Sequence, residues 1–292
     1  MTSSGKHLQP RRSHYENKVC ISCGDSAVRS NDVSGCDALE TSVKPAVTDL
    51  GITPQSYMLV GNSFTFYSCG MHNMINRLAR ADGQKIHRNR MVTIGGADLG
   101  WFNVWDLVRP TGIASTYVDH KDGGKIKRFD FTKEKVFDVV VLQDNSKGPI
   151  DPMRKDTFKQ ALERHTVDLT AIGIKPMVMM TWAWEGKPEM TKQLADATTT
   201  AANENNIMVV PAGLAFAEAL RLNPNLKLYR PDHFHPSAIG TYLAGCVLYA
   251  TMFHRTPVGL NFYGVDPVEP ETAKFLQQVA WDTTTEFFSW KK

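Results

Sequence analysis

The sequence of 292 residues has no long apolar run, little net charge and few cysteines. No apolar run approaches the roughly 18 residues that a membrane-spanning helix needs, so we expect no membrane span. A net charge of +3 is too small to indicate binding to nucleic acid or to an anionic membrane. Hydrophobic residues make up 42% of the chain, which excludes a fibrous or largely disordered protein. What remains is a soluble globular protein with one large domain or two small ones.

The 5 cysteines are too irregularly spaced to form a disulfide framework in a chain of this length. Cys20, Cys23 and Cys36 could supply three ligands of a zinc site, but no well-spaced fourth ligand follows them. We therefore favour free thiols at these positions.

Residues 1–50 differ in composition from the rest of the chain. They contain one aromatic residue, Tyr15, and many Ser, Asp, Lys and Arg residues without apolar periodicity. Such a segment cannot bury enough apolar surface to offset its ordering entropy. We therefore expect residues 1–50 to form a flexible or loosely packed extension and residues 51–292 to form the folded domain. The first residues also lack the apolar centre of a signal peptide. The cytoplasm is the default expectation for a chain that has not already lost a leader.

From Ser56 onward, short apolar runs alternate with longer helical patterns, which is typical of βαβ units around a parallel sheet. The run from Val139 to Leu142 suits a central strand that is buried on both faces. Between the strands, the spacing predicts a helix over residues 66–82 and two more around residues 158–169 and 239–250. Residues 112–130 are polar and contain glycine, so we expect a loop or an exposed hairpin there. The five predicted strands are residues 57–60, 90–94, 137–142, 176–181 and 207–211.

Polar residues follow these strands at the edge of the sheet where open parallel α/β proteins bind ligands. They supply a serine, glycine N–H donors, a side-chain amide and an Asp-x-x-His pair, which is the set that an acyl-transfer serine hydrolase needs. The four blocks are Gly61-Asn62-Ser63-Phe64-Thr65, Gly95-Gly96-Ala97-Asp98, Gln143-Asp144-Asn145-Ser146 and Asp232-His233-Phe234-His235-Pro236-Ser237.

Three of these residues have predicted roles as a catalytic triad. Ser63 lies where a strand turns into a helix and would be the nucleophile, and His235 would accept its proton. Asp232 would hold the imidazole tautomer and stabilise the imidazolium. The structural alternatives are a simple turn at Ser63 and a loop hydrogen bond between Asp232 and His235 ahead of a helix near Pro236.

The oxyanion of a tetrahedral intermediate needs fixed hydrogen-bond donors. The N–H groups of Ser63 and Gly96 and the side-chain amide of Asn145 are the candidates. Gly95 competes with Gly96 for this role, and Asn145 could instead cap a helix or a turn.

Four further residues are candidates for contact with the substrate. Gln143 and Asp144 could bind it, although structural hydrogen bonds near the nucleophile are an equal alternative. Trp182 and Trp184 could stack on a sugar or an acyl group, or belong to the core and its cover. A metal site at Asp232, His233 and His235 has no accompanying cluster of ligands. We therefore expect no metal and no cofactor.

The order Gly61-Asn62-Ser63, Gly96, Asn145 and Asp232-x-x-His235 resembles the SGNH (GDSL-type) hydrolase superfamily. The resemblance covers residues 56–262 and is greatest to a bacterial branch with Gly-Asn-Ser-Phe-Thr, Leu-Gln-x-x-Ser and His-Pro-Ser-x-x-Gly-x-Tyr-Leu blocks. It implies a three-layer α/β/α, flavodoxin-like domain with a central parallel five-stranded sheet. It also implies that the four residues named in "SGNH" are Ser63, Gly96, Asn145 and His235.

The sequence departs from the superfamily at two positions beside the site. Asn62 replaces the usual Asp before the nucleophile, and Gln143 replaces the Gly of the Gly-x-Asn block. Both leave the reaction class unchanged, and the second places a side chain near the pocket. We expect an esterase acting on a small-molecule or glycan ester, with a preference for a small acyl group such as acetyl on a carbohydrate. The alternatives are a lipase or thioesterase with the same triad and a non-catalytic glycan-binding protein with the same fold.

Overall fold

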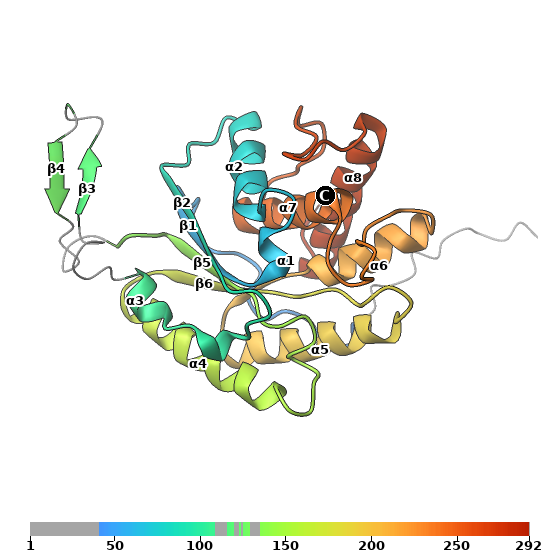
Figure 1. Cartoon of the computed structure of the whole chain (residues 1–292), viewed down its shortest axis with the longest axis horizontal. Coiled ribbons are helices and arrows are strands. Elements are labelled where there is room, and N and C mark those ends of the chain that lie inside the picture. The colour runs from blue at the N-terminus through green and yellow to red at the C-terminus, as the bar shows by residue number, and fades with distance from the viewer. Residues whose placement is uncertain (1–40, 109–115, 120–122, 124, 129–134, 292) are drawn as a thin grey trace, which may run out of the picture. The chain divides into compact units, whose positions relative to one another are not determined.

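The computed structural model describes residues 41–108, 116–119, 123, 125–128 and 135–291 (Figure 1). The described residues belong to one compact unit that spans residues 38–292. Most of the predicted extension, with Cys20, Cys23 and Cys36, lies outside the described residues. The elements are β1 (Ser56–Gly61), α1 (Ser63–Phe66), α2 (Met71–Ala81), β2 (Arg88–Thr93), η1 (Leu99–Trp101), α3 (Val104–Val108), β3 (Thr116–Asp119), β4 (Lys125–Arg128), β5 (Val139–Leu142), α4 (Lys155–Ala171), β6 (Lys175–Met179), α5 (Glu189–Glu204), β7 (Met208–Val210), α6 (Ala212–Leu222), α7 (Ala238–Phe253) and α8 (Pro270–Phe288).

A five-stranded sheet in the order β2-β1-β5-β6-β7 forms the centre of the described unit. Every pair of neighbouring strands is parallel, with Leu59 opposite Met91 on one side of β1 and Tyr57 opposite Val139 on the other. Counted along the sheet, this is the flavodoxin-like order 2-1-3-4-5. The predicted central parallel sheet is confirmed. Each of its strands begins and ends within two residues of the predicted boundaries.

Helices cover both faces of the sheet and complete three layers (Figure 1). α2, α7 and α8 lie on one face, and α4 and α5 lie on the other. β5 is buried at all four of its residues, as its continuous apolar sequence predicts for a central strand. α7 is apolar all round because it packs against α2, α6 and α8 as well as β7. The predicted three-layer α/β/α fold is confirmed.

The helix predicted over residues 66–82 is confirmed as α2, but it begins at Met71 and a separate short helix, α1, precedes it. α1 ends at Phe66 and α2 begins at Met71. Between them, Ser68, Cys69 and Gly70 have φ angles of 50°, 68° and 80°. These left-handed conformations are incompatible with a continuous right-handed helix, and they are uncommon for residues other than glycine. The break separates the short helix that begins at Ser63 from the longer helix that packs on α7.

A two-stranded antiparallel sheet lies within the segment predicted as a loop or hairpin. β3 pairs with β4, and Val118 lies opposite Ile126. The residues around the two strands lie outside the described part of the chain.

Residues 41–50 pack on the folded unit, although their composition groups them with the extension. Thr41 Oγ1 donates to Asp196 Oδ1 on α5 at 3.0 Å. The Ala46 N–H donates to Asn203 Oδ1 at 2.8 Å, and the Leu50 side chain is buried in the core. In the described part of the chain, no helix is long and apolar enough to cross a membrane.

Candidate active site

Ser63, His235 and Asp232 form a chain of hydrogen bonds at the carboxyl edge of the sheet. His235 Nε2 lies 2.7 Å from Ser63 Oγ, and these two residues are 172 positions apart in the sequence. On the other side of the ring, His235 Nδ1 lies 2.8 Å from Asp232 Oδ2. Ser63 and His235 are partly buried, and Asp232 is exposed. The structural alternative was a hydrogen bond between Asp232 and His235 within the loop alone. In the structure, His235 contacts Ser63 as well as Asp232.

The turn that carries Ser63 is held by the side chain of Asn62. Asn62 Oδ1 accepts the Phe64 N–H and caps α1, while Nδ2 donates to Ala97 O at 2.8 Å and to Asp144 O at 3.1 Å. An aspartate could provide the cap but not the two donations. The amide at this position therefore joins the nucleophile turn to the segments that follow β2 and β5.

Gln143 lies beneath the same turn. Its Oε1 accepts the Asn62 N–H at 2.9 Å, and its Nε2 donates to Asp144 O. A Cβ atom at Gly61 would come within 2.4 Å of Gln143 Oε1, so glycine is needed there for the close approach. The Gln143 side chain has no exposed surface. Gln143 is therefore a structural residue, which corrects its predicted contact with substrate.

Residues 229–237, here called the triad loop, carry Asp232 and His235. The Asp232 carboxylate accepts the His235 N–H at 3.0 Å and the Phe234 N–H at 3.2 Å. Partial burial raises the pKa of Asp232, but the hydrogen bonds from the His235 side chain and from these two N–H groups outweigh it and hold the pKa below its usual value. Asp232 is therefore a stable anion beside the imidazole.

The segment that follows β6 forms hydrogen bonds with the triad loop. The Glu185 N–H donates to His233 O at 2.8 Å, and Glu185 Oε2 lies 2.7 Å from His233 Nδ1. Trp182 Nε1 donates to Phe234 O at 3.0 Å, and Tyr229 Oη donates to Ala183 O at 2.8 Å. His233 thus faces Glu185 and takes no part in the chain from Ser63 to Asp232.

Two of the backbone donors predicted for the oxyanion hole have no acceptor within the described residues. In the segments that the structure describes, neither the Ser63 N–H nor the Gly96 N–H donates to a protein group. Gly96 has a φ of 75°, a conformation that favours glycine. Asn145 Nδ2 donates to Gly96 O at 3.1 Å, which leaves its second hydrogen available. The residues predicted for an oxyanion hole therefore come from three neighbouring segments that contact one another.

Asp144 is buried between these segments. Its side chain is 2% exposed, its Oδ1 accepts the Leu99 N–H at 2.7 Å, and its Oδ2 has no hydrogen-bond partner in the described residues. Burial raises the pKa of Asp144 to about 7, with a further increase from the Asp98 charge, although hydrogen bonds from Leu99 and Asn145 oppose the shift. A side chain buried in this way does not face a substrate, which corrects the second predicted contact.

Trp182 belongs to the core and not to a stacking platform. It is fully buried, with Phe64 stacked on it at 4.7 Å between ring centroids and Phe216 at 4.2 Å. The predicted substrate contact is therefore wrong for Trp182. Trp184 is half-buried, and its ring lies 5.6 Å from the Lys147 ammonium. Trp184 keeps some surface for a ligand.

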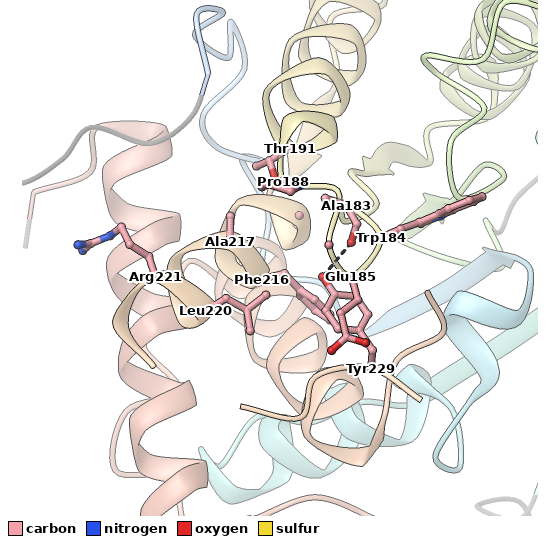
Figure 2. Close-up of a pocket in the computed structure, with 12 residues that line it drawn as sticks. Ala183, Trp184, Glu185, Pro188, Thr191, Phe216, Ala217, Leu220, Arg221 and Tyr229 are labelled. Atoms are coloured by element: carbon pink, nitrogen blue, oxygen red, sulfur yellow. Dashed lines mark hydrogen bonds between the residues drawn. The ribbon is translucent and has the colours of Figure 1, made fainter. Parts of the chain in front are cut away.

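A cavity of about 290 Å³ lies between α6 and the segment that follows β6 (Figure 2). Phe216, Leu220 and Ala217 line it from α6, and Figure 2 shows the hydrogen bond from Tyr229 to Ala183 beside it. None of its lining residues in the described part of the chain belongs to the triad. The rings of Phe216, Trp182 and Phe64 form a stack from the cavity to the Ser63 helix, so the cavity is not the space in front of the nucleophile.

Two residues beside the triad, Tyr67 and Arg230, lie outside the four sequence blocks and were not predicted. Tyr67, just after α1, has its ring centroid 4.6 Å from that of His235. The guanidinium carbon of Arg230 lies 4.8 Å from the centre of the Tyr67 ring. Arg230 is two residues before Asp232, so its place in the triad loop is the only hint that the sequence offers.

No group of three or more His, Cys, Asp and Glu side chains suited to a metal ion occurs within the described residues. Asp232, His233 and His235 do not converge, because His233 points to Glu185 while His235 lies between Ser63 and Asp232.

Comparison with solved structures shows similar folds at low sequence identity. A DUF4886 family protein from Bacteroides uniformis is 20% identical, with a TM-score of 0.54 over 81% of this chain and 96% of that one. A protein described as a candidate SGNH hydrolase from Slackia heliotrinireducens is 23% identical, with a TM-score of 0.48 over 68% of this chain and 98% of that one. The acetyl xylan esterase AlAXEase is 16% identical, with a TM-score of 0.48 over 67% of this chain and 98% of that one.

No family model and no curated protein matches the sequence. The likeness to the Bacteroides protein concerns the fold and not the activity, because 20% identity is too low to carry a function. The strand order and the flanking helices agree with the resemblance found in the four sequence blocks. The chain therefore has a three-layer α/β/α fold, which it shares with the Bacteroides protein.

Proposed function

We propose that the protein is a serine ester hydrolase that works through an acyl-enzyme. The observation that carries this proposal is the line of hydrogen bonds from Ser63 Oγ to His235 Nε2 and from His235 Nδ1 to Asp232. A nucleophile, a base and an orienting carboxylate in this geometry are the parts that acyl transfer requires.

In the first half of the reaction, His235 takes the Ser63 proton as Oγ attacks the ester carbonyl. The imidazolium then gives that proton to the departing alcohol, and the acyl group remains on Ser63. In the second half, His235 takes a proton from water as the water oxygen attacks the acyl carbon. The bond from that carbon to Ser63 Oγ then breaks, His235 returns the proton to Oγ, and the acid is released. The low pKa of Asp232 keeps it an anion beside the imidazolium in both halves.

Oxyanion stabilisation is assigned to the N–H groups of Ser63 and Gly96 and to the Asn145 amide. The support is that both backbone donors are free of protein acceptors within the described residues. Fixed donors of this kind lower the barrier because they need no reorganisation as charge develops on the carbonyl oxygen.

Within this class we propose an ester of a small acyl group, acetyl above all, on a carbohydrate or a similar polar alcohol. The resemblance to the SGNH hydrolases favours it. Trp101, which is 64% exposed, and the half-buried Trp184 offer rings for stacking on a sugar.

A second candidate is a longer acyl chain, as in lipases and thioesterases. Three other large apolar side chains are exposed on the segments after β1, β2 and β5, and these are Phe66, Ile94 and Met153. A series of p-nitrophenyl esters from acetate to decanoate separates the two candidates, because kcat/KM falls with chain length for an acetylesterase and rises for a lipase.

The test of the reaction class is hydrolysis of p-nitrophenyl acetate by the wild type and by Ser63→Ala. We expect turnover that the substitution abolishes, while the circular dichroism spectrum and the Tm stay the same. No turnover above the Ser63→Ala background in folded wild-type protein would favour the non-catalytic glycan-binding alternative.

A further inference from the structure

Arg230, Tyr67 and His235 form a row of contacts beside the nucleophile. The guanidinium of Arg230 lies 4.8 Å from the centre of the Tyr67 ring, and the Tyr67 ring lies 4.6 Å from the His235 ring. His235 Nε2 in turn contacts Ser63 Oγ. Arg230 is exposed and Tyr67 is partly buried, so the row runs from solvent to the reacting serine.

The backbone of Arg230 is fixed in the triad loop. Its N–H donates to His235 O at 2.9 Å, and its carbonyl accepts the His233 N–H at 2.9 Å. The side chain therefore starts from a defined point, and its guanidinium carbon lies over the Tyr67 ring. The ring attracts the cation without supplying an oxygen or nitrogen acceptor, so this contact leaves the N–H donors available.

The carboxylates near Arg230 already have other partners. Asp232 pairs with His235, and Glu185 pairs with His233. Within the described residues, Arg230 forms no ion pair with either of them or with any other carboxylate. A positive charge with five N–H donors thus lies next to the site, and no acceptor for it occurs among the described residues.

The position of this charge relative to His235 indicates which half of the substrate it contacts. In the proposed reaction, His235 gives its proton to the oxygen of the departing alcohol. The side chains packed on His235 therefore lie beside the alcohol half of the ester. The oxyanion donors of Gly96 and Asn145 lie on other segments, which follow β2 and β5.

We propose that Arg230, supported by Tyr67, binds an anionic group on the alcohol half of the substrate. The substrate class is then an acyl ester of an alcohol that carries a carboxylate, sulfate or similar oxyanion. Arginine suits this role because its planar fork makes two parallel hydrogen bonds to two coplanar oxygens. This inference rests on the proposed function and assigns the specificity of that same site.

The experiment compares three acetyl esters that differ in one group. The esters are 4-acetoxybenzoate, 4-acetoxybenzenesulfonate and the neutral 4-acetoxybenzamide, each corrected for its rate of hydroxide-catalysed hydrolysis. We expect the wild type to prefer an anionic ester by roughly ten- to a hundredfold in kcat/KM, mainly through KM, as hydrogen bonds to a charged group predict. A preference for only one of the two anions identifies which oxyanion the site accepts.

The variants separate a specific contact from the general field of the protein. Arg230→Gln should lose the preference, so that its kcat/KM for the anionic esters falls to its value for the neutral ester, and Arg230→Lys should retain only part of the preference. Lys227→Gln removes the same charge from an exposed neighbour of the triad loop and should keep the preference. Tyr67→Phe should keep it as well, because the ring remains.

A wild type that hydrolyses the neutral ester through Ser63 but shows no preference for either anion would overturn this inference and leave the proposed function intact. A preference that survives in Arg230→Gln would overturn it too. Failure of the proposed function is distinct, since no ester would then turn over. In that case isothermal titration calorimetry with 4-hydroxybenzoate and the neutral 4-hydroxybenzamide tests the inference. It is supported if the wild type binds only the benzoate and Arg230→Gln does not bind it. It is refuted if the wild type binds both compounds equally or neither of them.

Discussion

Two loops lie beside the turn that carries Ser63, and they are held in different ways. The triad loop, residues 229–237, is bonded to the segment after β6 through Tyr229, His233 and Phe234. The glycine loop, residues 94–98, exposes Gly95 and Gly96 to solvent. Two of its carbonyl groups accept hydrogen bonds from side-chain amides. Ala97 O accepts one from Asn62, and Gly96 O accepts one from Asn145.

This difference indicates that the proposed triad and the proposed oxyanion donors can be disturbed separately. A change in the triad loop should remove the base and leave the glycine loop in place. A change at Asn62 or Asp144 should loosen the glycine loop and the nucleophile turn together, because both residues lie between the segments that carry them.

The largest expected effect comes from breaking the triad itself. His235→Ala should lower kcat/KM for p-nitrophenyl acetate by about a thousandfold or more, because Ser63 loses its base. Circular dichroism checks that the variant is folded, because the His235 side chain is only 15% exposed and packs against Phe64, Tyr67 and Phe234.

The matched control for this prediction is His233→Asn in the same loop. His233 has a φ of 68°, which asparagine tolerates, and its ring bonds only to the exposed Glu185. This variant loses an exposed hydrogen bond to Glu185 and should retain activity within about fivefold. Equal losses in the two variants would contradict the assignment of His235 as the base.

The next effect concerns the side chain that joins the two halves of the site. Asn62→Asp should destabilise the protein by about 3 kcal/mol or more, because it removes two buried donations and directs a carboxylate at the carbonyl oxygens of Ala97 and Asp144. Urea unfolding measures the change. The same substitution at the exposed Asn223, whose side-chain oxygen only accepts the Asn225 N–H, is the control and should be nearly neutral. A neutral Asn62→Asp would contradict the account of the nucleophile turn.

The smallest effect depends on pH. The pKa of Asp144 rises on folding from 3.8 to about 7, so the folded state binds this proton more tightly than the unfolded state. Its contribution to stability is complete below about pH 4 and is lost as the pH rises through 7. Asp144→Asn has no carboxyl group to ionise, so its stability does not fall in this pH range for that reason. The asparagine side chain still has an oxygen that can accept the Leu99 N–H. The free energy of unfolding of the variant, relative to wild type, should therefore increase by on the order of 2–4 kcal/mol between pH 4 and pH 8. If the difference in unfolding free energy between variant and wild type does not change with pH, the raised pKa of the buried Asp144 carboxyl is refuted.

The parts of the fold that the sequence predicted are those with a local signal. Buried parallel strands read as apolar runs, and the carboxyl ends of parallel strands lie along one edge, so Ser63 and His235 could be assigned to one site across 172 positions. The Asp-x-x-His spacing brought Asp232 to His235 for the same local reason.

The parts that were missed depend on contacts that no local pattern encodes. Ser68 and Cys69 adopt left-handed conformations that their residue types do not predict, so the break between α1 and α2 was not foreseen. Trp182 follows a strand and could have faced either the core or the site, and only packing between Phe64 and Phe216 decides it. The contact of Arg230 with Tyr67 joins two distant segments and needs the folded chain.

The most direct test of the central claim is covalent labelling with an alkyl phosphonate ester, read by intact mass and peptide mapping. Our account predicts one adduct on the wild type, located at Ser63, none on Ser63→Ala and much slower labelling of His235→Ala. A folded wild type that forms no adduct, or a Ser63→Ala variant that is labelled at the same rate, would contradict the assignment of Ser63 as an activated nucleophile.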